Sequence, residues 1–490
     1  MDWKREAAAG LVALAAATSP IWWSQATGNE VYGLNLFFVT LVFLLLFQLL
    51  KGNHLPRNFL LLAYILGLAF TNHLQIVLLF PTLLLLFLFH RGSWELNLRS
   101  WILAGFLFFL GLLTYLYLPI RSAAGPLADW GATSDWGNFL RHITGWQYRV
   151  YIFDIPFDQM VENGMAALGT VATQLKWPLW ILFAGLFFVR LPNRKVLLPL
   201  LLYPVIILVY NAGYAIPDID FYYLPVIFCL FILAGAGVFG WFSYFSKLKE
   251  GKGKAIAAFL IFLSASTAYA AFSNWGSADQ SKNRFAQEVV ENIYASAPDG
   301  GLVFTAQWDH YSPWLYNHFA LGKRPDLKIL NVNLTNRSWY LDFLARALPE
   351  TVEGLESKMD AYRAMVRDFE TGRPIDTTQI EGLRQTILAS MLRKGYASGP
   401  VYFDVGTGFD SAAGWFMAPE GALFRAYDRP GYYPFETPPL GFSRTEFAGL
   451  PEEKIIRREV ESLNWILNLR KNYEKIFGPK SPAGDTRNRP

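Results

Sequence analysis

One carboxylate stands between the first two apolar runs of the chain. Glu30 follows Trp22 and Trp23 and comes shortly before the second run. A carboxylate at the edge of a bilayer can accept the proton of an attacking hydroxyl, which is the task of a general base. An acid at this place can also stabilise the start of a helix through the helix dipole. The residue alone leaves a catalytic base and a helix-starting acid as open alternatives.

A histidine lies between two later apolar runs. Asn72-His73 separates residues 58–71 from residues 74–90. Ionisable side chains at membrane depth are costly, and they mark a functional site by default. A hydrogen bond from His73 to a neighbouring helix is an equally good explanation. One histidine does not make a metal site, so His73 is a candidate binding residue and no metal is predicted.

The segment 120–165 carries a group of side chains that suits a phosphorylated sugar. A planar guanidinium donates two parallel hydrogen bonds to phosphate oxygens, and aromatic rings suit the faces of sugars. The candidates are Arg121, Asp129, Arg141, His142, Gln147, Tyr148 and Arg149. An interfacial helix anchored by its aromatic residues is the alternative. The presence of Arg, His, Gln and Asp in one segment favours a ligand.

Two further pairs have weaker support. Asp218 and Asp220 lie in a turn where they could bind a cation weakly, although capping of the following helix is the commoner role. Asp309 and His310 follow a predicted strand, and ligand loops of α/β sheets lie at strand ends. The sequence gives only thin support to a catalytic Asp309–His310 pair.

The elements that position these residues follow from the composition. The 490 residues are 53% hydrophobic and 17% charged, whereas soluble proteins carry about 45–50% apolar and about 25% charged residues. A bilayer-spanning helix needs about 20 apolar residues. Nine apolar runs precede residue 274, at 7–24, 33–50, 58–71, 74–90, 100–119, 166–190, 195–212, 221–245 and 254–273. The third and fourth form either a broken pair or one long tilted helix, which would change the count by one.

The charges of the loops predict the orientation of the chain. Lysine and arginine gather in cytoplasmic loops, and here they occupy alternate loops, beginning with Lys4 and Arg5. The intervening loops carry the acids instead, apart from Arg121, Arg141 and Arg149 in the long loop. This alternation supports about nine spans in a multi-pass protein of the cell membrane, with a cytoplasmic N-terminus and an extracytoplasmic C-terminal domain.

The C-terminal part has an ordinary mixed composition and predicts an α/β domain. Strands at 301–305, 327–332 and 401–405 alternate with helices, which favours a partly parallel sheet. An amphipathic helix at 451–476 precedes a polar tail. The predicted organisation is a membrane domain at 1–273, an extracytoplasmic α/β domain at 274–476 and a disordered tail at 477–490.

Several classes of function are excluded. The net charge of +4 is small for this length, so nucleic acid is not an expected partner. The single cysteine, Cys229, allows no internal disulfide and no cysteine-based metal site. The absence of a Walker loop, a GxGxxG turn and an HExxH motif argues against an ATPase, a dinucleotide enzyme and a zincin. No cofactor is predicted, and the need for a divalent cation is open.

A set of short motifs resembles a known family. In order they are Ser19-Pro-Ile-Trp-Trp-Ser-Gln-Ala, Glu30-Val-Tyr32, Thr71-Asn-His73, Tyr117-Leu-Pro-Ile-Arg121, Asp129-Trp-Gly131, Phe139-Leu-Arg-His142, Gln147-Tyr148, Ile216-Pro-Asp218, Trp308-Asp309 and Trp339-Tyr340. Together they resemble a bacterial family of unknown function. That family is similar to the GT-C glycosyltransferases and to the animal transmembrane O-mannosyltransferase.

The resemblance implies a reaction and its partners. Such enzymes pass a hexose, with mannose as the first candidate, from a polyprenyl-phosphate donor to a hydroxyl group of an exported protein or glycan at the membrane. By resemblance, Glu30 is the catalytic carboxylate, and the phosphate is held by Arg121, His73, Arg141, His142 and Arg149.

One departure from the family pattern affects this assignment. GT-C enzymes of this type begin with a further span and an outer loop that carries an acidic catalytic motif, and we expect both to be missing from this chain. The alternative is therefore a catalytically inactive, truncated paralogue that binds lipid-linked sugar or scaffolds envelope assembly. A flippase is a third option, but its polar residues should line a path through the membrane.

Overall fold

The computed structural model describes residues 3–28, 30–92, 94, 96–189, 194–216, 219–407, 414–443 and 452–478. The chain forms two compact units. Among the described residues, the helical unit comprises those within 3–120 and 134–281, and the α/β unit comprises those within 121–133, 282–443 and 452–478. The segment Arg121–Thr133 thus packs with the C-terminal unit, although it lies inside the predicted membrane domain at 1–273.

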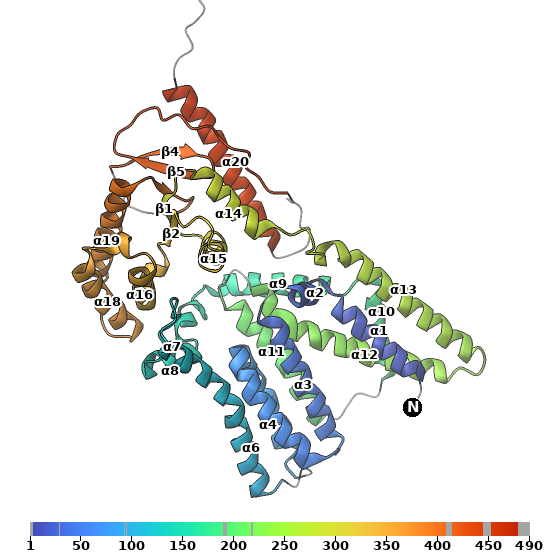
Figure 1. The fold of residues 1–490 in the computed structure, drawn as a ribbon. Helices are drawn as coiled ribbons and strands as arrows, with labels where there is room; N and C mark the ends of the chain where they lie inside the picture. Colours follow the sequence, from blue (N-terminus) through green and yellow to red (C-terminus); the bar gives the residue numbers. More distant parts are fainter. Residues whose placement is uncertain are drawn as a thin grey trace, which may run out of the picture. The chain divides into compact units, whose positions relative to one another are not determined.

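The helical unit consists of helices joined by short turns (Figure 1), and several of these helices are strongly apolar. Its α-helices are α1 (Trp3–Ala17), α2 (Pro20–Thr27), α3 (Tyr32–Leu50), α4 (Leu55–Asn72), α5 (Phe80–His90), α6 (Leu98–Leu112), α8 (Trp136–Ile143), α9 (Phe157–Thr173), α10 (Ile181–Ala184), α11 (Arg194–Ala212), α12 (Leu224–Ser246) and α13 (Lys252–Ala278). Short 3₁₀ turns connect them, among them η1 (Leu74–Leu79), η3 (Trp146–Tyr151) and η6 (Ile219–Tyr223), and α7 (Tyr117–Ala123) leads into the α/β unit.

The predicted count of about nine spans is not confirmed. Within the described ranges, five helical segments are long and apolar enough to cross a membrane: Tyr32–Leu50, Leu98–Ala123, Arg194–Ala212, Ile219–Ser246 and Lys252–Gly276. Two sharply bent pairs, α1 with α2 and Phe157–Thr173 with Trp177–Phe188, raise the number to seven if each pair is one span. The runs at 58–71 and 74–90 are separate helices that break at His73, and neither is among these candidates.

Two glycines allow helices α4 and α6 to pack closely. A Cβ atom at Gly67 would lie 2.1 Å from the carbonyl oxygen of Phe108, and one at Gly111 would lie 2.8 Å from the oxygen of Tyr64. Small residues let two membrane helices bring their backbones together. The two helices lie side by side as a result (Figure 1).

We expect Gly67→Ala to lower the midpoint of thermal unfolding of the detergent-solubilised chain by several degrees, because the added methyl group forces α4 and α6 apart. Gly105→Ala on α6 is the matched control, since a Cβ there meets no atom within 4 Å. Circular dichroism during heating measures both variants. Equal midpoints for the two variants would contradict the close packing.

The α/β unit contains a five-stranded sheet with the order β2-β1-β3-β5-β4. The strands are β1 (Gly301–Thr305), β2 (Leu327–Asn331), β3 (Val401–Phe403), β4 (Phe416–Glu420) and β5 (Leu423–Tyr427). Strands β2 and β3 run parallel to β1, whereas β5 is antiparallel to both β3 and β4. The three parallel strands are those predicted from the sequence, and the β4–β5 hairpin is an addition.

Helices cover this sheet (Figure 1). They are α14 (Phe285–Ser296), α15 (Trp308–Leu315), α16 (Ser338–Ala347), α17 (Pro349–Val352), α18 (Glu356–Glu370), α19 (Thr377–Ser398) and α20 (Glu452–Phe477). The core includes the fully buried Val303, Phe304, Trp314, Tyr340 and Tyr402. Of the predicted disordered tail, residues 479–490 lie outside the described residues.

The strand order creates a switch point in this sheet. After β1 the chain continues to β2 on one side, and it later returns to place β3 on the other side of β1. The carboxyl ends of β1 and β3 therefore flank the point where the connections diverge. In open α/β sheets, ligands bind at such points.

Candidate functional site

One end of the helical unit collects polar side chains from helices that are otherwise apolar. At this end α2 finishes, α3 begins, α4 gives way to η1, and α11 leads toward η6. We call it the polar end and define it by Gln25, Tyr32, Asn35, His73, Gln75, Asn211, Tyr214 and Tyr222. Apart from the half-buried His73 and Tyr222, these side chains are buried.

His73 stands at the break between α4 and η1. Its Nδ1 accepts a hydrogen bond of 3.2 Å from the backbone N–H of Gln75, so the ring caps the new turn. An accepting Nδ1 leaves the proton of the neutral ring on Nε2. The ring centroid lies 5.4 Å from that of Tyr32 and 5.1 Å from that of Tyr222. His73 thus caps a helix and also belongs to an aromatic cluster.

A chain of amide hydrogen bonds joins three elements at the polar end. The Asn35 Nδ2 on α3 donates to the Gln75 Oε1 at 3.3 Å. The Gln75 Nε2 in turn donates to the backbone oxygen of Tyr222 at 2.7 Å. These bonds hold the beginning of α3, the turn η1 and the turn η6 together. Amides can both donate and accept, which suits a site for hydroxyl groups.

The predicted loop residues Gln147, Tyr148 and Arg149 are brought to the polar end by backbone contacts. They belong to η3, which is followed by an antiparallel bridge between Ile152 and Tyr214. The ring of Tyr214 lies 5.6 Å from that of Tyr222. The side chains of Tyr148 and Arg149 are exposed, so they are accessible to a ligand.

Helix α8 carries the next two candidates and packs against η3. Asp135 caps its N-terminus, and the Arg141 guanidinium donates to the Asn138 Oδ1. Burial lowers the pKa of His142, so this ring is neutral at pH 7. Of the two, only Arg141 brings a full positive charge at neutral pH.

Of the remaining described candidates, only Glu30 belongs to the helical unit, two residues from Tyr32 of the polar end. Glu30 is exposed and lies two residues before α3, a place that suits both of its predicted roles. Arg121 and Asp129 belong to the α/β unit, where the Asp129 Oδ2 accepts a hydrogen bond of 2.8 Å from the Ser122 hydroxyl. Asp218 lies outside the described residues.

Three of the tryptophan motifs meet within the α/β unit. The ring of Trp130 lies 4.5 Å from that of Trp339 and 5.8 Å from that of Trp308. Trp130 and Trp308 are each nearly half exposed, whereas Trp339 is buried. Motifs that are about 180 and 210 residues apart in the sequence therefore form one aromatic cluster.

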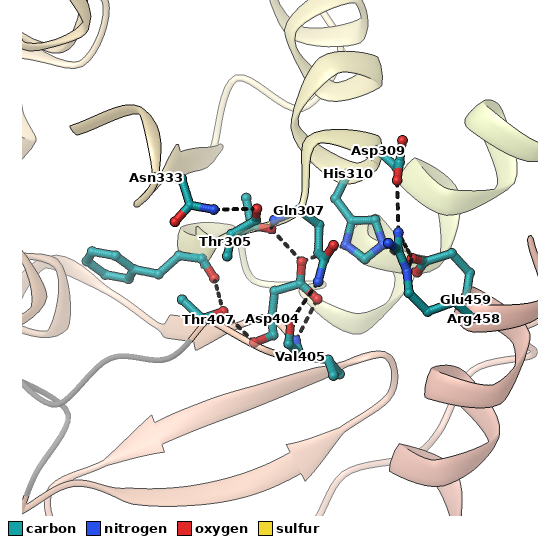
Figure 2. A network of polar contacts seen from close by, with 12 residues as sticks. Thr305, Gln307, Asp309, His310, Asn333, Asp404, Val405, Thr407, Arg458 and Glu459 are labelled. Atoms are coloured by element: carbon teal, nitrogen blue, oxygen red, sulfur yellow. Dashed lines mark hydrogen bonds and ion pairs between the residues drawn. The ribbon is translucent and has the colours of Figure 1, made fainter. Parts of the chain in front are cut away.

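The predicted Asp309–His310 pair is wrong. The Asp309 Oδ2 accepts a hydrogen bond of 2.8 Å from Arg458, whereas His310 is held between two other carboxylates (Figure 2). Its Nδ1 lies 2.6 Å from the Asp404 Oδ2, and its Nε2 lies 2.7 Å from the Glu459 Oε2. Adjacent side chains on a helix point in different directions, so sequence neighbours at the start of α15 reach different partners.

The two carboxylates keep His310 charged. Burial alone lowers the pKa of His310, but Asp404 and Glu459 outweigh it and raise the pKa to about 10. Burial also raises the pKa of Glu459. The hydrogen bonds from His310 and Arg458 lower it by more, so the pKa of Glu459 lies below its ordinary value. A histidine that is protonated at neutral pH cannot serve as a general base.

The carboxylate of Asp404 also accepts hydrogen bonds from other groups of the network. Besides His310, Asp404 accepts hydrogen bonds from the Thr305 hydroxyl at 2.5 Å and from the Val405 N–H at 2.7 Å (Figure 2). Thr305 ends β1 and Asp404 follows β3, so the network occupies the switch point of the sheet. Glu459 comes from α20. The arrangement therefore fastens the C-terminal helix to the sheet, and we assign it a structural role.

This assignment predicts a loss of stability in alkali. The His310 pKa is about 10 in the folded chain against an ordinary 6.5. The stabilisation is complete below pH 6.5 and is lost as the pH rises toward 10, because only the folded state retains the proton. Thermal unfolding of the full chain at pH 6.5 and pH 10 measures it. The fall in the thermal midpoint from pH 6.5 to pH 10 should be much smaller in His310→Gln than in the wild-type chain. An equal fall in both proteins would refute the assignment.

Sequence reasoning missed two kinds of residue. Asp404 was detectable, because it lies near the end of the strand predicted at 401–405, at the edge where Thr305 also ends a strand. Glu459 and the amides Asn35, Gln75 and Asn211 carried no motif. A polar residue within an apolar run was the only available signal for those amides.

Comparison with known proteins agrees with the motifs of the helical unit. The family model for the N-terminal domain of protein O-mannosyl-transferase TMEM260 matches residues 3–96, which include Glu30 and His73. The mouse protein O-mannosyl-transferase TMEM260 is 23% identical over 356 residues, which cover 68% of this chain and 50% of the mouse protein. The chain thus spans about half the length of this relative, and no solved structure matches it. By sequence, the chain resembles the animal protein O-mannosyl-transferase TMEM260.

Proposed function

We propose that this protein is a membrane glycosyltransferase of the GT-C type. It transfers a hexose, with mannose as the first candidate, from a polyprenyl-phosphate donor to a hydroxyl of an exported protein or glycan. The observation that carries the proposal is the polar end, where His73, Asn35 and Gln75 are joined at the end of apolar helices. The resemblance to a protein O-mannosyl-transferase supports the same function.

The reaction divides the work among a few side chains. The acceptor hydroxyl attacks the anomeric carbon, the bond from that carbon to the phosphate oxygen breaks, and polyprenyl phosphate leaves. Glu30 takes the proton of the hydroxyl. His73, Arg141 and Arg149 stabilise the negative charge on the leaving phosphate, since donors aimed at a developing charge lower the barrier. The lipid tail lies against the exposed apolar helix faces.

The proposal includes the location predicted from the loop charges. The chain is a multi-pass protein of the cell membrane with a cytoplasmic N-terminus and an extracytoplasmic C-terminal unit. The acceptor then meets the donor on the outer face. Arg121, Asp129 and Asp218 are further candidates for substrate binding, and a need for a divalent cation is tested by adding a chelator.

The test is transfer of radiolabelled mannose from polyprenyl-phosphate mannose by the purified full-length chain in lipid nanodiscs. An extract of exported proteins serves as acceptor, and glucose and galactose donors are run in parallel. We expect labelled product and released polyprenyl phosphate, both lost in Glu30→Gln. Binding of the donors without any transfer would instead support the predicted alternative, an inactive paralogue that holds lipid-linked sugar.

A further inference from the structure

Three buried amides at the polar end have polar atoms that lack a partner. Gln25, Asn35 and Asn211 are 4%, 3% and 1% exposed. In the described part of the helical unit, five buried side-chain polar atoms have no hydrogen-bond partner, and four of them are Gln25 Oε1, Asn35 Oδ1, Asn211 Oδ1 and Asn211 Nδ2. Each such atom destabilises the fold, because its hydrogen bonds to water are lost on burial and are not replaced. Their concentration in one place calls for an explanation.

Helix geometry places two of these amides at the same level of the helical unit. The rings of Phe43 on α3 and Tyr203 on α11 have centroids 5.8 Å apart. The two helices run in opposite directions, because α3 begins at the polar end and α11 finishes there. Asn35 is eight residues before Phe43, and Asn211 is eight residues after Tyr203. Eight residues rise about 12 Å in a helix, so both amides lie at the same level.

The buried faces of both helices agree with this placement. On α11 the buried residues Tyr203, Ile207 and Asn211 recur every fourth residue and so share one face. On α3 the buried set includes Asn35 and Phe43. The two amides therefore occupy the faces that pack inside the unit.

The third amide comes from α2. Its backbone passes so close to α3 that a Cβ atom at Gly33 would lie 3.2 Å from the Gln25 carbonyl oxygen. Gln25 thus lies beside Gly33 in the first turn of α3, and Gly33 is two residues before Asn35. Gln75 is bonded to Asn35 and lies on η1, which contacts α11. Amides from α2, α3, η1 and α11 therefore lie at the same end of the helical unit.

We propose that Gln25, Asn35 and Asn211 bind the hydroxyl groups of the hexose on the lipid-linked donor. The inference rests on the proposed function and names the residues that read the sugar. Three of the four unpartnered atoms are acceptors and one is a donor, and vicinal hydroxyls supply both kinds of partner. A phosphate offers acceptors only, so it belongs with His73 and the arginines. Neutral amides recognise the sugar, and the charged groups recognise the phosphate.

The test replaces Asn211 with leucine, which has a similar volume and no polar atoms. Two readouts are measured on the full chain in nanodiscs: the thermal midpoint without ligand, and the affinities for polyprenyl-phosphate mannose and for polyprenyl phosphate. We expect the midpoint to rise, because two unpartnered atoms disappear. We expect the affinity for the mannosyl lipid to fall about tenfold, which corresponds to about 1.4 kcal/mol, with the affinity for polyprenyl phosphate unchanged.

Two further variants keep the test decisive. Gln25→Leu carries the same expectation if Asn211→Leu does not fold. Asn163→Leu is the control, since the Asn163 Nδ2 already donates to the Ala212 oxygen at 3.1 Å. That variant should lose stability and keep the preference for the mannosyl lipid.

The outcomes separate this inference from the proposed function. An unchanged preference for the mannosyl lipid in both Asn211→Leu and Gln25→Leu overturns the inference, even if the wild-type chain transfers sugar. A wild-type chain that prefers the mannosyl lipid, loses this preference in the variants and transfers no sugar supports the inference and overturns the proposed enzyme.

Discussion

Replacing His310 with alanine should destabilise the α/β unit by about 3–5 kcal/mol, the usual cost of removing one partner from a buried ion pair. The substitution leaves Asp404 and Glu459 facing each other with no positive charge between them. Their side chains are 1% and 7% exposed, so water cannot screen the repulsion. Urea unfolding of the full chain, followed by tryptophan fluorescence, measures the change.

Two further variants test the cause of this loss. Adding Glu459→Gln to His310→Ala removes one of the two carboxylate charges that faced His310, so the double variant should recover part of the lost stability. Arg373→Ala breaks an ion pair whose side chains are 71% and 43% exposed, and it should cost less than about 1 kcal/mol. If His310→Ala costs no more than Arg373→Ala, the network does not fasten α20 to the sheet.

Replacing His73 with asparagine should reduce both the affinity for polyprenyl phosphate and the rate of sugar transfer by roughly 10- to 100-fold. A hydrogen bond to a charged group contributes about 1.5–3 kcal/mol, and about 1.4 kcal/mol corresponds to tenfold. An asparagine oxygen can still accept the hydrogen bond from the Gln75 N–H and cap η1. The variant therefore removes the ring Nε2–H and keeps the cap.

His54 provides the matched control. It is an exposed histidine that precedes α4 at the opposite end from His73, and its φ of 44° is one that asparagine adopts readily. His54→Asn should leave affinity and transfer unchanged. A His73→Asn chain with normal affinity for polyprenyl phosphate would show that His73 acts only as a cap and a packing residue.

The His310 and His73 substitutions affect different units of the molecule, so one expected result can fail while the other holds. His310 affects stability without touching the proposed substrate, and His73 affects the substrate with its structural hydrogen bond preserved. The Asn211→Leu variant gives a third combination of results, since it should lower the affinity for the mannosyl lipid and leave the affinity for polyprenyl phosphate unchanged. Together the three variants distinguish fastening, phosphate binding and sugar binding.

The sequence predicted elements better than partners. The strands β1, β2 and β3 were visible as runs of apolar residues, and a break at His73 was one of two alternatives that the sequence left open. The β4–β5 hairpin was not predicted, because Pro419 argues against a strand. Proline is tolerated at the edge of a sheet, where its missing N–H breaks no ladder, and β4 is the edge strand. The predicted number of spans is not confirmed, because apolar runs do not reveal where a helix bends or breaks.

What the sequence alone determined is the division into a helical unit and an α/β unit, together with the motifs that resemble an O-mannosyltransferase. Composition and short motifs are local properties, and a single pass along the chain detects them. Only the tertiary structure decided that Trp130 joins Trp308 and Trp339, that His310 pairs with Asp404 and Glu459, and that Asn35 bonds to Gln75. Those contacts join residues that are far apart in the chain, and they depend on packing that no local pattern encodes.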